Sequence, residues 1–131
     1  MAAASDLRGR KTVADPKRAK ETIVRKSLFT AILQQTKKVG KVEIKEIEFH
    51  PGQKTGVHLH PCPVVGYIAE GSAVIQMEGR GSETLKAGDA FFEPANVRIL
   101  RFDNASNEAG MKFIAFYLLG EEERELIRLL E

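Results

Sequence analysis

The stretch HPGQKTGVHLHPCPVVGYIAEG, residues 50–71, decides the fold class of this chain of 131 residues. It contains all three histidines of the chain, and a single leucine separates His58 from His60. On a β-strand, residues i and i+2 point to the same side and lie about 7 Å apart along the chain. The two imidazoles can therefore reach one ion, and imidazole suits a divalent transition metal such as Fe, Mn, Ni, Cu or Zn.

Short runs with β character surround this stretch, and Gly, Pro and Asn separate them. Many short strands with tight turns and no interleaved helix predict an antiparallel sandwich or barrel. In KVEIKEIEF, residues 41–49, the apolar alternation changes phase, which predicts a β-bulge near Lys45 or Glu46. The chain ends in GEEERELIRLLE, where an acidic first turn precedes an apolar stripe. This pattern predicts a short C-terminal helix.

Composition indicates one globular domain over residues 22–131, preceded by a flexible basic N-terminal arm over residues 1–21. Hydrophobic residues make up 43% and charged residues 29% of the chain, as in ordinary globular proteins. No apolar run is long enough to span a bilayer, and the N-terminus lacks the apolar core of a secretory signal. We therefore expect a cytoplasmic protein without a membrane partner.

Nucleic acid is not an expected partner, although the first 26 residues hold eight Lys and Arg against three Asp and Glu. These residues include no aromatic side chain that could stack on a base. The single cysteine, Cys62, excludes an internal disulfide, and packing is its expected role.

Two motifs resemble those of the cupin superfamily. Gly52, five further residues, then His58, Leu59 and His60, followed by GYIAEG ending at Gly71, resemble the first motif. LKAGDAFFEPANVRILRFDN, residues 85–104, resembles the second. The resemblance implies an all-β double-stranded β-helix, the jelly-roll barrel of small single-domain, RmlC-like cupins of bacterial type. It also implies a homodimer.

The metal site that the resemblance implies is degenerate. The glutamate ligand of metal-binding cupins aligns with Val64 here, and their last histidine ligand aligns with Ile99. Glu93 precedes a proline turn, and the sequence leaves open which way its side chain points. Two interpretations follow: His58 and His60 hold a divalent transition metal weakly, or they form a hydrogen-bonded pair without a metal.

The predicted function is binding of a small molecule in an otherwise apolar pocket, where His58 and His60 orient the ligand. One alternative is a metal-dependent enzyme, such as an oxygenase, a decarboxylase or an isomerase, and a second is a sensor or interaction module. Arg101 would favour an anionic ligand if it faced inward, or would lie along the surface. No catalytic residue can be named. The predicted pocket-lining residues are Val57, Val64, Ile68, Ile75, Gln76, Phe91, Ile99 and Arg101.

Overall fold

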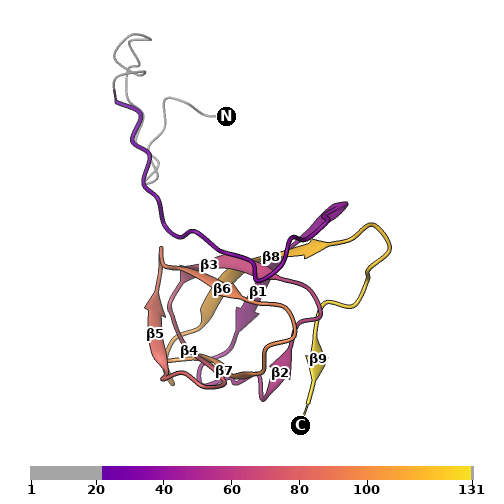
Figure 1. The fold of residues 1–131 in the computed structure, drawn as a ribbon. Helices are drawn as coiled ribbons and strands as arrows, with labels where there is room; N and C mark the ends of the chain where they lie inside the picture. Colours follow the sequence, from indigo (N-terminus) through magenta and orange to yellow (C-terminus); the bar gives the residue numbers. More distant parts are fainter. Residues whose placement is uncertain (1–21, 131) are drawn as a thin grey trace.

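The computed structural model describes residues 22–130, and this range forms nine β-strands and no helix (Figure 1). The N-terminal arm predicted over residues 1–21 lies outside the described residues. Between residues 22 and 130, no segment is a helix that could cross a membrane. The strands are β1 (Lys41–Phe49), β2 (His58–Leu59), β3 (Val64–Glu70), β4 (Ser72–Met77), β5 (Glu83–Lys86), β6 (Ala90–Glu93), β7 (Ile99–Asn104), β8 (Met111–Leu119) and β9 (Arg128–Leu129).

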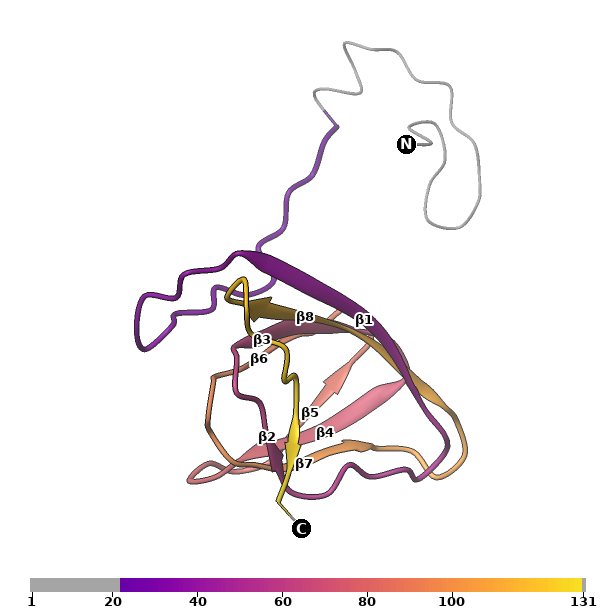
Figure 2. The same ribbon diagram turned by 90° about the vertical axis from the view of Figure 1, so that its right-hand side faces the viewer.

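The strands form two antiparallel sheets that lie face to face (Figure 2). One sheet has the strand order β1-β8-β3-β6, and the other has the order β5-β4-β7-β2-β9. Neighbours in each sheet are mostly distant in sequence, as expected for a jelly roll rather than a simple meander. The predicted all-β jelly-roll barrel is therefore confirmed.

The core lies between the two sheets, and the pleat of β8 shows how it is built. Every second side chain of β8, from Met111 to Leu119, is buried, while those between them are half-buried on the outer face. Phe113 of this strand packs against Phe102 of β7 with ring centroids 4.5 Å apart. Phe102 in turn contacts Phe91 of β6, at 5.1 Å. Alternation in the sequence therefore becomes an aromatic core shared by both sheets.

The prediction of a β-bulge in β1 is wrong. β1 pairs with β8 without interruption, from Lys41 opposite Leu119 to Phe49 opposite Met111. The apolar alternation changes phase because Val42 and Ile44 lie on one face of a regular strand, whereas Ile47 and Phe49 lie on the other. Phe49 packs against the core, whereas Val42 and Ile44 are exposed on the outer face of the sheet.

The prediction of a C-terminal helix is also wrong. After a turn at Gly120–Glu123, the chain runs in an extended conformation and ends in β9, which pairs with β2. Its apolar residues do not form one buried stripe, because Leu126 packs against the core while Leu129 is exposed. Pairing with the free edge of β2 outweighs the weak helical preference of this short segment.

Candidate metal centre

His58 and His60 lie at the edge of the barrel interior, where β2 runs between β7 and β9. Both side chains point the same way, as their i, i+2 spacing predicts, and their ring centroids are 5.1 Å apart. They are 2% and 4% exposed, respectively. β2 ends at Leu59, and Pro61 follows His60 directly. The histidine pair is thus enclosed within the protein.

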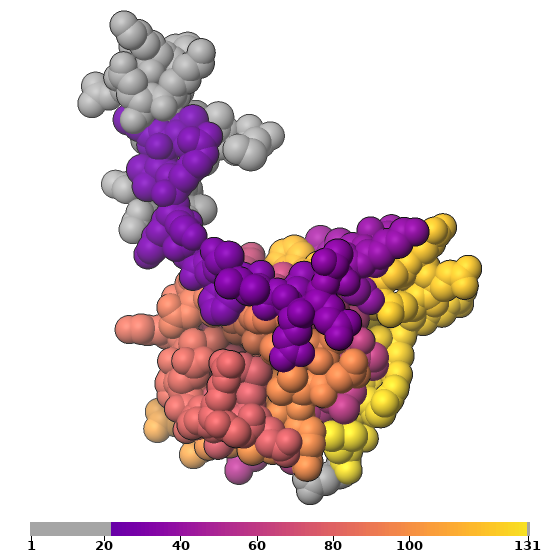
Figure 3. Space-filling model, in the orientation of Figure 1, coloured from indigo at the N-terminus to yellow at the C-terminus, as the bar shows by residue number. Residues whose placement is uncertain are grey.

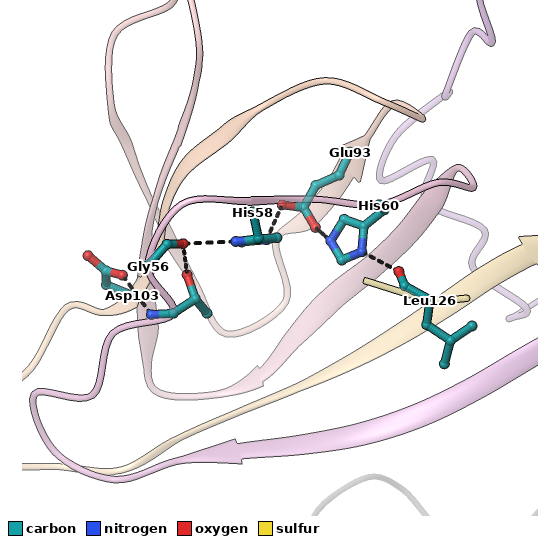
Figure 4. A network of polar contacts seen from close by, with 7 residues as sticks. Gly56, His58, His60, Glu93, Asp103 and Leu126 are labelled. Atoms are coloured by element: carbon teal, nitrogen blue, oxygen red, sulfur yellow. Dashed lines mark hydrogen bonds and ion pairs between the residues drawn. The ribbon is translucent and has the colours of Figure 1, made fainter. Parts of the chain in front are cut away.

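Glu93, the last residue of β6, brings a carboxylate to the same place (Figure 4). Its Oε1 lies 3.0 Å from Nε2 of His60, and its Oε2 lies 3.9 Å from Nε2 of His58. Potential ligand atoms of the three residues all lie within 4.8 Å of one another. Glu93 is 3% exposed, and its register partner on β3 is Val64. The inward direction of Glu93 follows from this cross-strand pairing, which the sequence did not reveal.

Hydrogen bonds to the backbone indicate which ring nitrogen carries the proton. Nδ1 of His58 lies 3.0 Å from the carbonyl oxygen of Gly56, and Nδ1 of His60 lies 2.8 Å from that of Leu126. Because a carbonyl oxygen only accepts hydrogen bonds, each Nδ1 is a donor. The Nε2 atoms of both rings therefore face Glu93. In the neutral form of each ring, Nε2 offers a lone pair.

Burial and the charge of Glu93 both act on the pKa values of His60 and Tyr117. Burial by itself lowers the pKa of His60, but the hydrogen bond and the charge of Glu93, with the carbonyl of Leu126, outweigh it and raise the pKa above 6.5. Burial, reinforced by Glu93, raises the pKa of Tyr117 to about 12. Tyr117 therefore keeps its hydroxyl proton at neutral pH and can donate a hydrogen bond.

The three residues fit a divalent transition metal. Within residues 22–130, Oε2 of Glu93 is the only buried side-chain oxygen or nitrogen that lacks a hydrogen-bond partner. It lies 3.9 Å from Nε2 of His58, too far for a hydrogen bond. A cation would satisfy both atoms. Two imidazoles and one carboxylate form a ligand set known for zinc and for non-haem iron, with coordination positions left open.

A small cavity of about 120 Å³ adjoins the cluster. His58, His60 and Glu93 lie on its wall together with Tyr117, and the remaining lining is mainly aromatic and aliphatic. Its apolar lining residues are Ile47, Phe49, Val64, Phe102, Phe113, Ala115 and Ile127. The cavity therefore joins a few polar groups to an apolar wall, as in many small-molecule sites.

Of the residues predicted to line a pocket, Val64 lines this cavity. Four others are buried in the hydrophobic core, and they are Ile68, Ile75, Phe91 and Ile99. Ile99 is the register partner of His58 on β7. Val57 is half-buried, and its carbonyl accepts a hydrogen bond from the amide of Leu130.

The two predicted polar lining residues lie away from the cavity. Gln76 donates a hydrogen bond to the carbonyl of Arg80 in the hairpin turn between β4 and β5. Arg101 pairs with Asp103 at 3.1 Å, and its side chain is 43% exposed. A register shift between Gln76 and Met77 breaks the simple alternation of β7 on which the inward direction of Arg101 depended.

Comparison with known proteins agrees with this architecture. The family model described as "Cupin domain" matches residues 45–117, whereas no curated protein matches. A cupin-like protein from Thermotoga maritima is similar in structure, with 22% identity, a TM-score of 0.57, and coverage of 68% of this chain and 64% of that one. An RmlC-like cupin from Shewanella frigidimarina is 27% identical, with a TM-score of 0.52 and coverage of 62% and 68%.

The DMSP lyase DddQ from Ruegeria pomeroyi is also similar in structure, with 19% identity and a TM-score of 0.57. The match covers 67% of this chain but only 42% of the lyase, so this likeness shows the fold alone. The family match spans more than half of the chain and includes all three residues of the His58, His60 and Glu93 cluster. The chain belongs to the cupin family.

Proposed function

We propose that this cupin binds one divalent transition metal ion through His58, His60 and Glu93, and holds a small ligand in the adjoining cavity. The observation that supports this most directly is the unpartnered Oε2 of Glu93, which faces Nε2 of His58 at 3.9 Å. A buried carboxylate oxygen without a partner is costly. A cation between the two acceptors removes that cost.

The surrounding residues orient the two imidazoles and form an apolar wall around the cavity. A bound ion would act as a Lewis acid toward a ligand oxygen. The carbonyls of Gly56 and Leu126 hold the two imidazoles with Nε2 toward Glu93. Tyr117, which lines the cavity, keeps its proton and can donate a hydrogen bond to a ligand. The apolar side chains exclude bulk water, which strengthens these polar contacts.

The size of the cavity limits the ligand. Its volume of about 120 Å³ is well below the roughly 300–1,000 Å³ of pockets that hold drug-sized molecules. This favours a small ligand with few non-hydrogen atoms.

The runner-up is a metal-dependent enzyme, either an oxygenase, a decarboxylase or an isomerase. Its support is the ligand set, because three protein ligands leave positions at which a substrate could be activated. Ligand turnover by the metal-loaded protein distinguishes this alternative from a binding protein.

Elemental analysis of protein purified without a metal-affinity tag tests the metal site. We expect about one equivalent of a transition metal in the wild type after loading with Zn²⁺ and gel filtration, and none in the His58→Ala, His60→Ala double variant. Glu93→Gln keeps the side-chain shape but removes the anionic ligand, so we expect Zn²⁺ affinity to fall at least about tenfold, the lower end of the loss when a group behind a metal ligand is removed. Glu83→Gln, on the exposed part of β5, is the matched control. A wild type that retains no Zn²⁺ would contradict the proposal.

We further propose that two copies pair through the outer face of the β1-β8-β3-β6 sheet. Val42 and Ile44 of β1 are exposed there, beside the outward side chains of Phe116 and Leu118, their register partners on β8. Exposed Phe29 lies against Phe92 of β6 in the same sheet, with ring centroids 6.4 Å apart. In a symmetric dimer the same patch of both copies meets, so the exposed apolar side chains of one copy would cover those of the other.

A further inference from the structure

We infer that residues 120–130, which we term the C-terminal strap, form a gate over the metal centre and position His60 for metal binding. This inference rests on the proposed metal-binding function. The strap lies along the surface of the barrel (yellow in Figure 3) and runs beside β2. It replaces the helix that the sequence predicted, so its role could not be read from the motif residues.

Both ends of the strap are attached to the barrel. Near its start, Glu123 forms an ion pair with Lys37, which lies in the segment just before β1. At its end, β9 pairs with β2, where Leu129 is the register partner of His58. The amide of Leu130 then donates to the carbonyl of Val57 at 3.0 Å. The strap therefore crosses the site between two attachments.

Two consecutive residues of the strap contact the site. The carbonyl of Leu126 accepts the hydrogen bond from Nδ1 of His60 at 2.8 Å (Figure 4). Ile127 lines the cavity although the residue is 43% exposed. One part of Ile127 thus faces the cavity and another part faces solvent. This residue therefore separates the cavity from solvent.

The strap is the weakest part of the cavity wall. β9 has only two residues, and the side chains of Arg128, Leu129 and Leu130 are exposed. By contrast, the wall provided by β8 is a nine-residue strand paired on both sides. Segments with few buried contacts and exposed backbone hydrogen bonds open most readily. A ligand can therefore enter by displacement of the strap while the barrel stays folded.

Opening of the strap also releases the tautomer and the ring orientation of His60. While the strap is closed, the carbonyl of Leu126 holds the proton on Nδ1 and directs Nε2 toward Glu93. Such a hydrogen bond from the second ring nitrogen fixes the tautomer and the orientation of a metal-binding histidine. When the strap opens, the ring loses this constraint. Leu126 is therefore a positioning residue, and access to the cavity is coupled to the order of the metal ligand.

Hydrogen exchange of the metal-free, full-length protein tests the gate. The chain has three histidines, so the Nδ1 proton of His60 can be assigned by NMR. Leu130→Pro removes the amide that bonds to Val57, whereas Leu130→Ala keeps it. We expect the His60 ring proton to exchange about five to ten times faster in Leu130→Pro than in Leu130→Ala. The amide protons of β3 and β8 should exchange equally in both variants.

If the His60 ring proton exchanged at the same rate in the two variants, the gate would be overturned. The same holds if Leu130→Pro accelerated the exchange of the β3 and β8 amides as much as that of the ring proton. Since no metal is present, this result does not depend on the proposed function.

Metal release provides the second test. Co²⁺ bound to the full-length protein is followed by its visible absorption while EDTA removes it. We expect Ile127→Ala to release Co²⁺ at least about five times faster than wild type, because it removes the partition between cavity and solvent. Leu129→Ala, an equal truncation on an exposed residue of the strap, should release it at the wild-type rate. Equal release rates in both variants would overturn the gate, and failure to bind Co²⁺ at all would instead contradict the proposed function.

Discussion

Glu93 of β6 and Val64 of β3 are directly opposed across two antiparallel strands, and both side chains line the cavity beside His58 and His60. Opposed residues have Cβ atoms about 5 Å apart and project from the same face of the sheet. In the motif that resembles that of metal-binding cupins, Val64 stands where they have a glutamate ligand. A carboxylate therefore reaches the same site from the neighbouring strand, although the first motif contains only the two histidines.

This relationship predicts that the carboxylate can be exchanged between the two strands. Glu93→Val should abolish Zn²⁺ retention, because it leaves only two imidazole ligands. The double variant Val64→Glu, Glu93→Val should recover retention to within about tenfold of the wild-type affinity, since the carboxylate again projects from the same face. Isothermal titration of the metal-free proteins with Zn²⁺ measures both changes. A double variant as weak as Glu93→Val would show that the two positions are not equivalent.

The stability of the metal-free protein should depend on the protonation of His60. Its pKa in the folded protein is raised above 6.5 by Glu93 and the carbonyl of Leu126, against the lowering effect of burial. The folded state therefore binds this proton more tightly than the unfolded state. The resulting stabilisation is fully present below about pH 6.5 and is lost as the pH rises through the folded pKa.

Urea unfolding in the presence of EDTA, between pH 5.5 and 9, measures this dependence. His60→Asn should remove that part of the pH dependence, while His50→Asn, at an exposed position, should keep it. The opposite trend is expected for Zn²⁺ affinity, which should rise with pH because the metal must displace the proton. If the difference in stability between wild type and His60→Asn did not change with pH, His60 would not be the source of the pH dependence.

Close packing at Gly66 should make this position intolerant of any side chain. A Cβ atom there would lie 2.0 Å from the carbonyl oxygen of Ile114 and 2.6 Å from the ring of Phe91. We expect Gly66→Ala to lower the free energy of unfolding by about 3 kcal/mol or more, because the backbone of β8 must move. Gly81→Ala is the control, since a Cβ there meets nothing within 4 Å. Thermal unfolding followed by circular dichroism compares the two, and equal melting temperatures would refute the predicted clash.

Pairing of two copies predicts a specific effect of charge on the outer sheet face. Ile44 is 60% exposed on β1, and Leu129 is 64% exposed on β9 of the other sheet. Ile44→Glu should convert a dimer into a monomer, because two carboxylates would be buried at a symmetric interface. Leu129→Glu, on the other sheet, should keep the mass of a dimer. Light scattering after size-exclusion chromatography gives the masses, and a wild-type monomer would rule out the pairing.

The barrel could be predicted from the sequence because its main signals are local. Alternating apolar residues and closely spaced turns specify strands such as β8, whose buried positions follow the pattern residue by residue. The spacing of His58 and His60 likewise places both rings on one side of a short strand. These features depend on the two-residue period of a β-strand, and a neighbouring strand is not needed to predict them.

The complete candidate metal site was decided by contacts between segments far apart in the chain. The direction of Glu93 depends on the register of β6 with β3, and the orientation of His60 depends on the carbonyl of Leu126, which lies 66 residues away in sequence. The C-terminal segment has a helical pattern of apolar residues, yet it adopts an extended conformation because the edge of β2 offers it hydrogen bonds. The sequence alone therefore determined the barrel and the histidine pair. Strand register and the docking of the C-terminal segment determined the third candidate ligand and the wall over it, because both arise from non-local hydrogen bonds that no local pattern encodes.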